Sequence, residues 1–211
     1  ERIMNHPFLG GTFGPVYNRQ ALAAGFTWED LQKLANLMAD NVFVSTYVQD
    51  LKLRGVDMLF HPGTHDFVCF DLAWGGKHHP NIPIYLRPNS GHGKRGGHPG
   101  AERGEQNKAA FLMEHFFEDF DSLLEPPSVK SQREGNRLQV EVTFKPGNKA
   151  ESGRIFWIYD RGPDGSAAYL DDMIPKENWG DMKYDRAKKA WTVAIELDSD
   201  AKRIDFFSNH R

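Results

Sequence analysis

Cysteine, long apolar runs and clustered charge of one sign are what this sequence lacks. Cys69 is the only cysteine among 211 residues, so an internal disulfide and a cysteine-rich zinc site are excluded. No apolar run approaches the ~18 residues that a membrane-spanning helix requires. The net charge is -3, and the lysines and arginines are spread along the chain. This charge pattern argues against nucleic acid and against an anionic membrane surface as partners.

A starting methionine and a signal-type apolar segment are also missing from the beginning of the sequence. Glu1 leads directly into a segment rich in glycine and asparagine, and Arg211 follows an apolar run. We therefore expect that this chain is a piece of a longer polypeptide and that it associates with the missing N-terminal part. The alternative is that the ends of the sequence were simply trimmed. In either case the sequence does not distinguish a secreted or periplasmic location from the cytoplasm.

The pattern of elements changes at Pro126-Pro127. Before this dipeptide, helical and strand patterns alternate, and after it only strand patterns occur. A chain of 211 residues with 39% hydrophobic residues is long enough for two small domains, each with its own core. We predict one domain over residues 1–125 and a second over residues 126–211.

The first part shows the signals of helices that are followed by short strands. Thr27 and Asp30 have the spacing of a capping box at a helix start. Helices are predicted over residues 42–53 and 105–121, and short strands over residues 56–60 and 82–86. The second helix carries a stripe that we expect to be buried, made of Ala109, Leu112, Met113, Phe116 and Phe120.

The second part has the signals of a small all-β domain. Turn sequences rich in proline and glycine separate apolar and alternating segments, which is typical of a β-sandwich. Strands are predicted over residues 138–144, 154–159, 191–197 and 203–207. Its tyrosines and tryptophans are candidates either for the sandwich core or for a face that stacks on sugars. These residues are Trp157, Tyr159, Tyr169, Trp179, Tyr184 and Trp191.

The strongest chemical signal is a carboxylate and an imidazole that each follow a predicted strand. Asp66 lies in the turn after residues 56–60, and His92 lies in the turn after residues 82–86. Parallel strands that lie side by side bring both turns to one edge of a sheet. There a carboxylate can hold the tautomer of a histidine that acts as general base for a hydroxyl nucleophile. We therefore predict Asp66 and His92 as catalytic residues.

This order of turns resembles the C-terminal half of an α/β-hydrolase. The matching runs are Gly63-Thr64-His65-Asp66 and Asn89-Ser90-Gly91-His92-Gly93. With a β-sandwich appended, the chain looks most like the PhoPQ-activated pathogenicity-related proteins and neighbouring esterases and peptidases. The resemblance implies an α/β fold class: a parallel sheet with flanking helices, the C-terminal portion of an α/β-hydrolase, followed by a small all-β, immunoglobulin- or fibronectin-like sandwich.

The nucleophile that the resemblance implies is missing from the chain. The family would supply a serine on a Gly-x-Ser-x-Gly elbow, but this motif does not occur here. Ser45 lies in a predicted helix and Ser90 precedes the histidine in its own turn. We therefore expect a hydrolase that cleaves an ester or amide, a small-molecule or peptide acyl substrate, with Asp66 and His92 supplied here and the serine supplied from upstream.

The sequence is also compatible with two other functions. In the first alternative, the chain is a non-catalytic, hydrolase-like scaffold whose β-sandwich binds a ligand such as a carbohydrate. A metal-dependent hydrolase is the third possibility, because several histidines and aspartates lie in a short span. These residues are His61, His65, Asp66, Asp71, His78, His79, His92 and His98. No His-Glu-x-x-His motif is present, and the first-ranked function predicts neither a metal nor a cofactor. An exposed half-sheet would also favour a homo-oligomer.

Overall fold

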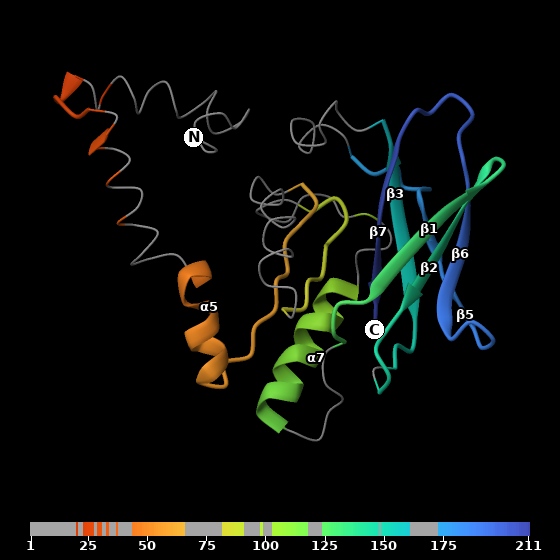
Figure 1. Cartoon of the computed structure of the whole chain (residues 1–211), viewed down its shortest axis with the longest axis horizontal. Coiled ribbons are helices and arrows are strands. Elements are labelled where there is room, and N and C mark those ends of the chain that lie inside the picture. Colours follow the sequence, from red (N-terminus) through yellow and green to blue (C-terminus); the bar gives the residue numbers. More distant parts are fainter. Residues whose placement is uncertain are drawn as a thin grey trace. The chain divides into compact units, whose positions relative to one another are not determined.

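The computed structural model describes residues 20, 23–27, 29–30, 33, 37, 44–65, 82–90, 98, 103–117, 124–147, 149–160 and 173–211. The chain divides into two compact units, Glu1–Asp57 and Met58–Arg211. The predicted boundary between residues 125 and 126 stays a prediction. Within the described residues the helices are α5 (Val44–Leu53) and α7 (Arg103–Phe117) (Figure 1). The strands are β1 (Ser128–Glu134), β2 (Arg137–Thr143), β3 (Gly153–Tyr159), β4 (Trp179–Asp181), β5 (Lys183–Asp185), β6 (Ala190–Glu196) and β7 (Ile204–His210).

The first unit contains the capping box that the sequence predicts. The backbone N–H of Thr27 donates to Asp30 Oδ2 at 2.9 Å, and the backbone N–H of Asp30 donates to Thr27 Oγ1 at 3.2 Å. The Thr27 hydroxyl also donates to this carboxylate and, with the backbone N–H of Thr27, holds the pKa of Asp30 below its usual value. The same unit contains α5, which agrees with the helix predicted over residues 42–53.

Helix α5 ends where its sequence predicts. Lys52 lies in its last turn, where a positive charge interacts favourably with the helix dipole. Gly55 follows with a φ of 72°, a left-handed conformation that glycine adopts without steric cost. No helix in the described part of the chain is long and apolar enough to cross a membrane.

The second unit contains two antiparallel sheets that pack into a sandwich. The strand order is β1-β2-β6-β5 in one sheet and β4-β3-β7 in the other (Figure 1). In the first sheet Leu138 lies opposite Ile195 and Val142 opposite Trp191, so the apolar side chains of β2 and β6 share one face. The strands predicted over residues 138–144, 154–159, 191–197 and 203–207 correspond to β2, β3, β6 and β7.

The core of the sandwich lies between these two sheets. Val140 and Val142 from the first sheet and Ile155 from the second are fully buried in a single cluster. Each such aliphatic side chain contributes roughly 1.5–3 kcal/mol when it is fully removed from water. Because one cluster takes side chains from both sheets, neither sheet would be stable without the other.

Three strands were not predicted from the sequence. All seven residues of β1 are exposed, so it has no alternation of apolar and polar residues to mark it. It forms because Ser128 to Glu134 pairs along its whole length with β2 across the turn at Gly135 and Asn136. Strands β4 and β5 are three residues each, which is too short for a periodic pattern.

The stripe predicted to be buried on α7 is largely exposed. The side chains of Leu112 and Phe116 are 51% and 68% exposed, Ala109 is also exposed, and Met113 is half-buried. Phe120 lies outside the described residues. Spacing identified an apolar face correctly but could not identify what covers it, because that depends on the elements that surround the helix.

The predicted α/β fold class is wrong. The described strands form two antiparallel sheets, and no parallel sheet flanked by helices occurs among the described residues. The two predicted strands before α7 do meet in parallel, but only as two isolated bridges, which join Phe60 to Ile84 and Gly63 to Arg87. An assignment to the α/β-hydrolases on the basis of fold is therefore wrong as well.

Proline explains why this parallel pairing does not become a sheet. The N–H of Phe60 donates to the carbonyl of Pro83, and the N–H of Arg87 donates to the carbonyl of Pro62. In a regular parallel ladder the N–H of residue 62 would donate next, but proline has none. The ladder is therefore interrupted at Pro62. Because proline cannot donate to a ladder, it is confined within sheets to edge strands and irregular segments.

Candidate functional site

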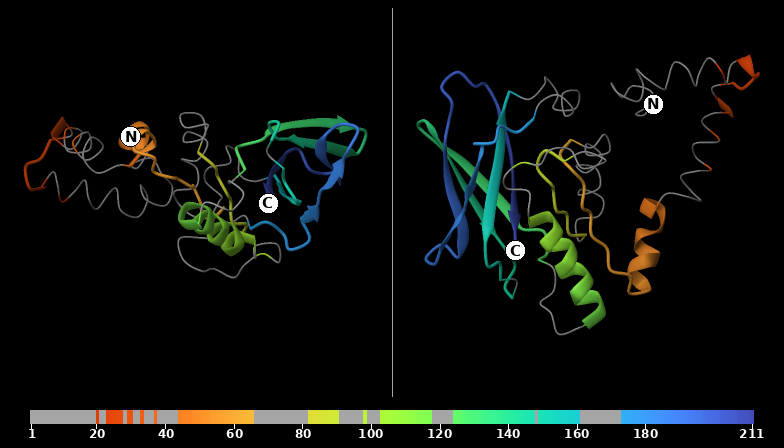
Figure 2. Two further views of the ribbon diagram at one scale, coloured as in Figure 1. Left: turned by 90° about the horizontal axis from the view of Figure 1, so that it is seen from below. Right: turned by 180° about the vertical axis from the view of Figure 1, so that it is seen from behind.

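The two predicted catalytic residues follow two turns that the structure brings together. Asp66 and His92 themselves lie outside the described residues, as do Cys69, Asp71, His78 and His79. Residues 63–65 and 87–90, which precede Asp66 and His92, are described. These two segments, here called the paired turns, lie side by side at one end of the parallel pairing (Figure 2).

Backbone hydrogen bonds join the paired turns directly. The N–H of Thr64 donates to the carbonyl of Arg87, and the N–H of His65 donates to the carbonyl of Ser90, both at 2.9 Å. At Gly63 the two backbones almost touch, because a Cβ there would lie 1.9 Å from the Ser90 oxygen. Only glycine permits this close approach.

Polar side chains fill the space between the paired turns. Thr64, His65, Asn89 and Ser90 are all buried, with between 3% and 9% of their surface exposed. Thr64 Oγ1 accepts a hydrogen bond from the N–H of Asn89 at 2.8 Å and lies 2.9 Å from Nδ1 of His65. Its hydroxyl therefore bridges the two turns and fixes the His65 ring, which accounts for this histidine without a catalytic role.

Asn89 fastens the paired turns to the sandwich. Its side-chain nitrogen donates to the carbonyl of Ile174 at 2.7 Å, and its side-chain oxygen accepts the N–H of Ile174 at 2.9 Å. Its φ is 54°, a left-handed conformation that asparagine tolerates better than most residues. This two-bond clamp crosses the predicted domain boundary and fixes the segment around Ile174 against the turn that precedes His92.

His98 makes a second attachment to the same segment. Its Nε2 lies 2.9 Å from the carbonyl oxygen of Pro175, and because a carbonyl only accepts, Nε2 carries the hydrogen. The ring is buried and meets Phe156 edge to face. A metal would need a lone pair on this nitrogen, so Nε2 cannot bind one while the hydrogen bond is present.

The remaining described histidine among the metal candidates packs on an aromatic ring. His61 stacks on Tyr85 with 5.3 Å between ring centroids and 9° between the planes. Within the described residues no three histidine, cysteine or carboxylate side chains are close enough to hold a metal ion. The other candidates of the predicted metal site lie outside those residues.

The residues that hold this region together were not predicted from the sequence. Besides Asn89, Asn209 on β7 is buried and donates from its side chain to the carbonyl of Leu86 at 2.8 Å. The signal at Asn89 was its place in a Pro-Asn-Ser-Gly turn, where asparagine commonly takes a left-handed conformation. Asn209 had no signal, because it lies 123 residues from its partner.

The aromatic residues of the sandwich divide between core and surface. Trp191 is 9% exposed and belongs to the core cluster, while Tyr184 is 51% exposed and tilts against it at 5.6 Å. Arg154 lies over the Trp179 ring at 4.8 Å, a cation–π contact that occupies this face. Among the described aromatics, Tyr184 alone keeps more than half of its surface exposed on the sandwich.

No protein-family model, no curated protein and no solved structure matches this chain. The resemblance to hydrolases thus stays a prediction from the residues of the two turns.

Proposed function

We propose that the paired turns carry the acid–base part of a hydrolytic site for an ester or amide. In this proposal His92 takes a proton from a serine hydroxyl that residues 1–211 do not supply, and later gives it to the leaving group. Asp66 orients His92 and stabilises the imidazolium while it carries the proton. The acyl group passes from the substrate to the serine oxygen and then to water, which regenerates the hydroxyl.

One observation carries the proposal: the hydrogen bond of 2.9 Å from the N–H of His65 to the carbonyl of Ser90. Asp66 is the next residue after His65, and His92 is two residues after Ser90. Consecutive Cα atoms are ~3.8 Å apart, so both candidates start from positions close to this bond. The proposal uses this local arrangement and does not require a parallel sheet.

The fixed surroundings of the paired turns also support the proposal. A catalytic pair must be held in position by residues that are themselves fixed by packing and hydrogen bonds. The Asn89 clamp provides such support three residues before His92, and the Thr64 hydroxyl provides it two residues before Asp66. Ser90 is 9% exposed and its carbonyl is engaged by His65, so it supports the turn.

The decisive measurement is an NMR titration of His92 in the 211-residue chain. A nearby carboxylate stabilises the imidazolium, so Asp66→Asn should lower the pKa of His92 by about one unit. Asp50→Asn removes an aspartate on α5 and serves as the matched control, which should leave His92 unchanged. A His92 titration that is insensitive to Asp66→Asn would overturn the proposal.

The catalytic step is tested by labelling with a serine-reactive fluorophosphonate on a polypeptide that includes the sequence upstream of Glu1. We expect one labelled serine, with labelling strongly slowed by His92→Gln. Absence of labelling in a folded protein contradicts hydrolysis, even when the titration shows that Asp66 and His92 interact.

A further inference from the structure

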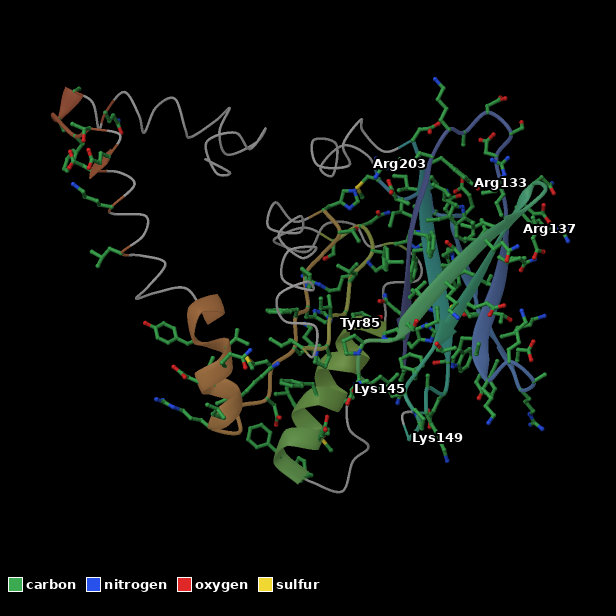
Figure 3. The ribbon with its side chains drawn as sticks, viewed as in Figure 1. Tyr85, Arg133, Arg137, Lys145, Lys149 and Arg203 are labelled. Atoms are coloured by element: carbon green, nitrogen blue, oxygen red, sulfur yellow. The ribbon has the colours of Figure 1, made fainter. Side chains whose placement is uncertain are left out.

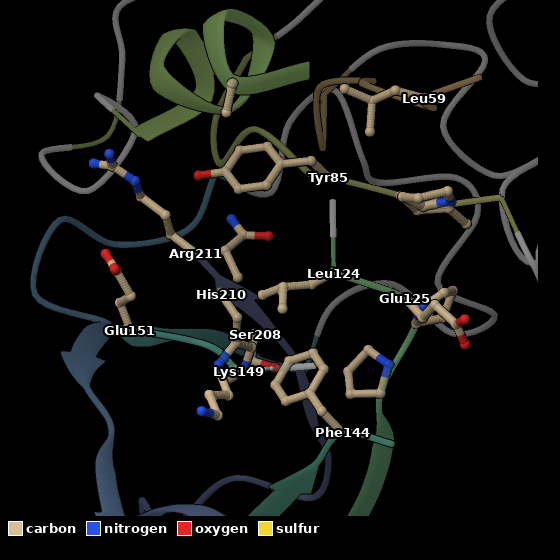
Figure 4. Close-up of a pocket in the computed structure, with 16 residues that line it drawn as sticks. Leu59, Tyr85, Leu124, Glu125, Phe144, Lys149, Glu151, Ser208, His210 and Arg211 are labelled. Carbon is tan, nitrogen blue, oxygen red and sulfur yellow. Dashed lines mark hydrogen bonds between the residues drawn. The ribbon is translucent and has the colours of Figure 1, made fainter. Parts of the chain in front are cut away.

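A second feature of the unit Met58–Arg211 has no part in the proposed hydrolysis. A cavity of about 410 Å³ opens between the 82–90 segment, α7 and the end of the sandwich (Figure 4). This volume lies in the range of sites for small organic ligands, roughly 300–1,000 Å³. All residues that line it belong to this one unit.

The inner walls of the cavity are apolar. Tyr85 and Phe144 lie on opposite sides, and Leu124 lies between them in Figure 4. Ile84 from the 82–90 segment and Ala110 from α7 add further apolar surface. Such walls favour an apolar ligand and offer few partners to the many hydroxyls of a sugar.

Other rings hold the two aromatic rings of the wall in place. His61 stacks on Tyr85 with 9° between the planes, and the ring of His210 meets Phe144 edge to face with 5.0 Å between centroids. A Cβ at Gly153 would lie 2.6 Å from the His210 ring, so glycine is required there to accommodate it. Aromatic rings attract one another in offset-stacked and edge-to-face arrangements, so two fixed rings on opposite sides favour an aromatic ligand.

The hydroxyl of Ser208 gives the cavity wall a hydrogen-bonding group. Ser208 Oγ lies 3.1 Å from Nε2 of His210. A hydroxyl oxygen has two acceptor lone pairs, so one of them stays available whether Ser208 donates or accepts in this hydrogen bond. Ser208 can therefore accept a hydrogen bond from an O–H group of a ligand.

The charges around the cavity balance one another. In the 211-residue chain the side chains of Lys149 and Arg211 are positive, and the side chain of Glu151 and the α-carboxylate of Arg211 are negative. Glu125 also lines the cavity and pairs with Lys145 at 2.5 Å. Both lysines lie at one end of the sandwich (Figure 3). An ionic ligand would add a charge that has no partner, which is costly away from water, whereas an uncharged ligand adds none.

We propose that this cavity binds an uncharged monocyclic phenol. The aromatic ring of the ligand lies between Tyr85 and Phe144, and its O–H donates to Ser208 Oγ. A phenol combines the three properties that these walls select, which are an aromatic body, one hydrogen-bond donor and no charge at neutral pH. This site is separate from the paired turns and holds whether or not they catalyse hydrolysis.

Calorimetric titration of the 211-residue chain with 4-propylphenol, propylbenzene, 4-propylbenzoate and 4-propylbenzylammonium tests the proposal. These probes share one ring and one propyl chain and differ in the head group. We expect saturable binding of the phenol, about fivefold weaker binding of propylbenzene and roughly tenfold weaker binding of each ion. Equal or tighter binding of any other probe overturns the proposal, and so does the absence of saturable binding of the phenol.

Two alanines of α7 provide matched variants that locate the site. Ala110 lines the cavity, whereas its neighbour Ala109 is exposed. Ala110→Leu should weaken binding of the phenol about tenfold, because the larger side chain occupies the space of the ligand. Ala109→Leu should leave binding unchanged. An equal effect of the two substitutions places the ligand elsewhere and contradicts the proposal.

Two further variants test the hydrogen bond and the charge balance separately. Ser208→Ala should reduce the affinity for 4-propylphenol to that for propylbenzene. Glu151→Gln, at an exposed position, removes one negative charge and should strengthen binding of 4-propylbenzoate about threefold without changing that of the phenol. Glu177→Gln is the control, because Glu177 is exposed and is not among the residues that line the cavity. Benzoate binding that Glu151→Gln does not alter contradicts the role of charge balance, even if Ser208→Ala fails to fold.

Discussion

At Gly63 the main chain approaches Ser90 so closely that no side chain has room. The contact that a Cβ would make is with a backbone oxygen, which cannot rotate away as a side chain can. Two backbone hydrogen bonds between the paired turns flank this residue, so a shift of either turn would break them. The packing of the paired turns thus depends on the absence of a single methyl group.

We expect Gly63→Ala to destabilise the second unit by roughly 2–4 kcal/mol, because the clash at 1.9 Å must be relieved by backbone movement. Tryptophan fluorescence during urea unfolding measures the change. Gly180→Ala is the matched control, since a Cβ at Gly180 has no heavy atom within 4 Å. Equal stability of the two variants would contradict the close approach of Gly63 to the Ser90 backbone.

Between elements, the main connection of the paired turns to the sandwich is the clamp from Asn89 to Ile174. Both atoms of the side-chain amide are used, and both backbone groups of Ile174 are satisfied by it. Asn209 of β7 makes a further connection to Leu86. These hydrogen bonds are buried. If one partner is removed, the other polar group is left unsatisfied, because no water is present to bond to it.

Asn89→Gly should destabilise the second unit by about 1–3 kcal/mol, since glycine keeps the left-handed backbone but removes both hydrogen bonds. Hydrogen exchange of the Ile174 amide gives the local measurement, and its protection should fall more than that of Val140 in the core. Lys189→Gly is the control, because Lys189 is also left-handed, with a φ of 52°, but lies in an exposed turn. A similar effect of both substitutions would assign the loss to the backbone and contradict the role of the clamp.

Considered as a whole, the second unit exposes apolar side chains on α7. Leu112, Phe116 and Phe117, here called the α7 stripe, are each more than half exposed. Phe116 follows Leu112 by one helical turn, so these two side chains lie on the same side of the helix. Contiguous apolar surface of this kind promotes association between proteins.

We expect the 211-residue chain to self-associate through the α7 stripe as its concentration rises. The double variant Leu112→Glu and Phe116→Glu should shift the sedimentation coefficient toward that of a monomer, because charge on the stripe opposes its burial. Val129→Glu replaces a single apolar residue, 49% exposed on β1, and should not change association. A wild-type chain that stays monomeric at high concentration contradicts this prediction.

Local sequence signals determined the elements that depend on neighbouring residues. The capping box at Thr27, helix α5 and its glycine terminus, and the apolar strands β2, β3, β6 and β7 are confirmed. In each case the decisive interactions lie within a few residues, or the alternation of side chains reflects burial on one face. The sequence also predicted that the two turns would meet in parallel, but it overestimated the extent of pairing because the effect of Pro62 was not considered.

Only the tertiary structure decided the fold class, the attachment of the paired turns to the sandwich and the exposure of α7. The partners of Asn89 and Asn209 lie 85 and 123 residues away, and β1 has no apolar pattern and forms because β2 is beside it. Periodicity shows that a face is apolar, but the chain's path in space decides whether another element covers it. Contacts between residues so far apart in the sequence leave no local signature, since neither residue type nor spacing specifies which distant segment will pack against a given residue.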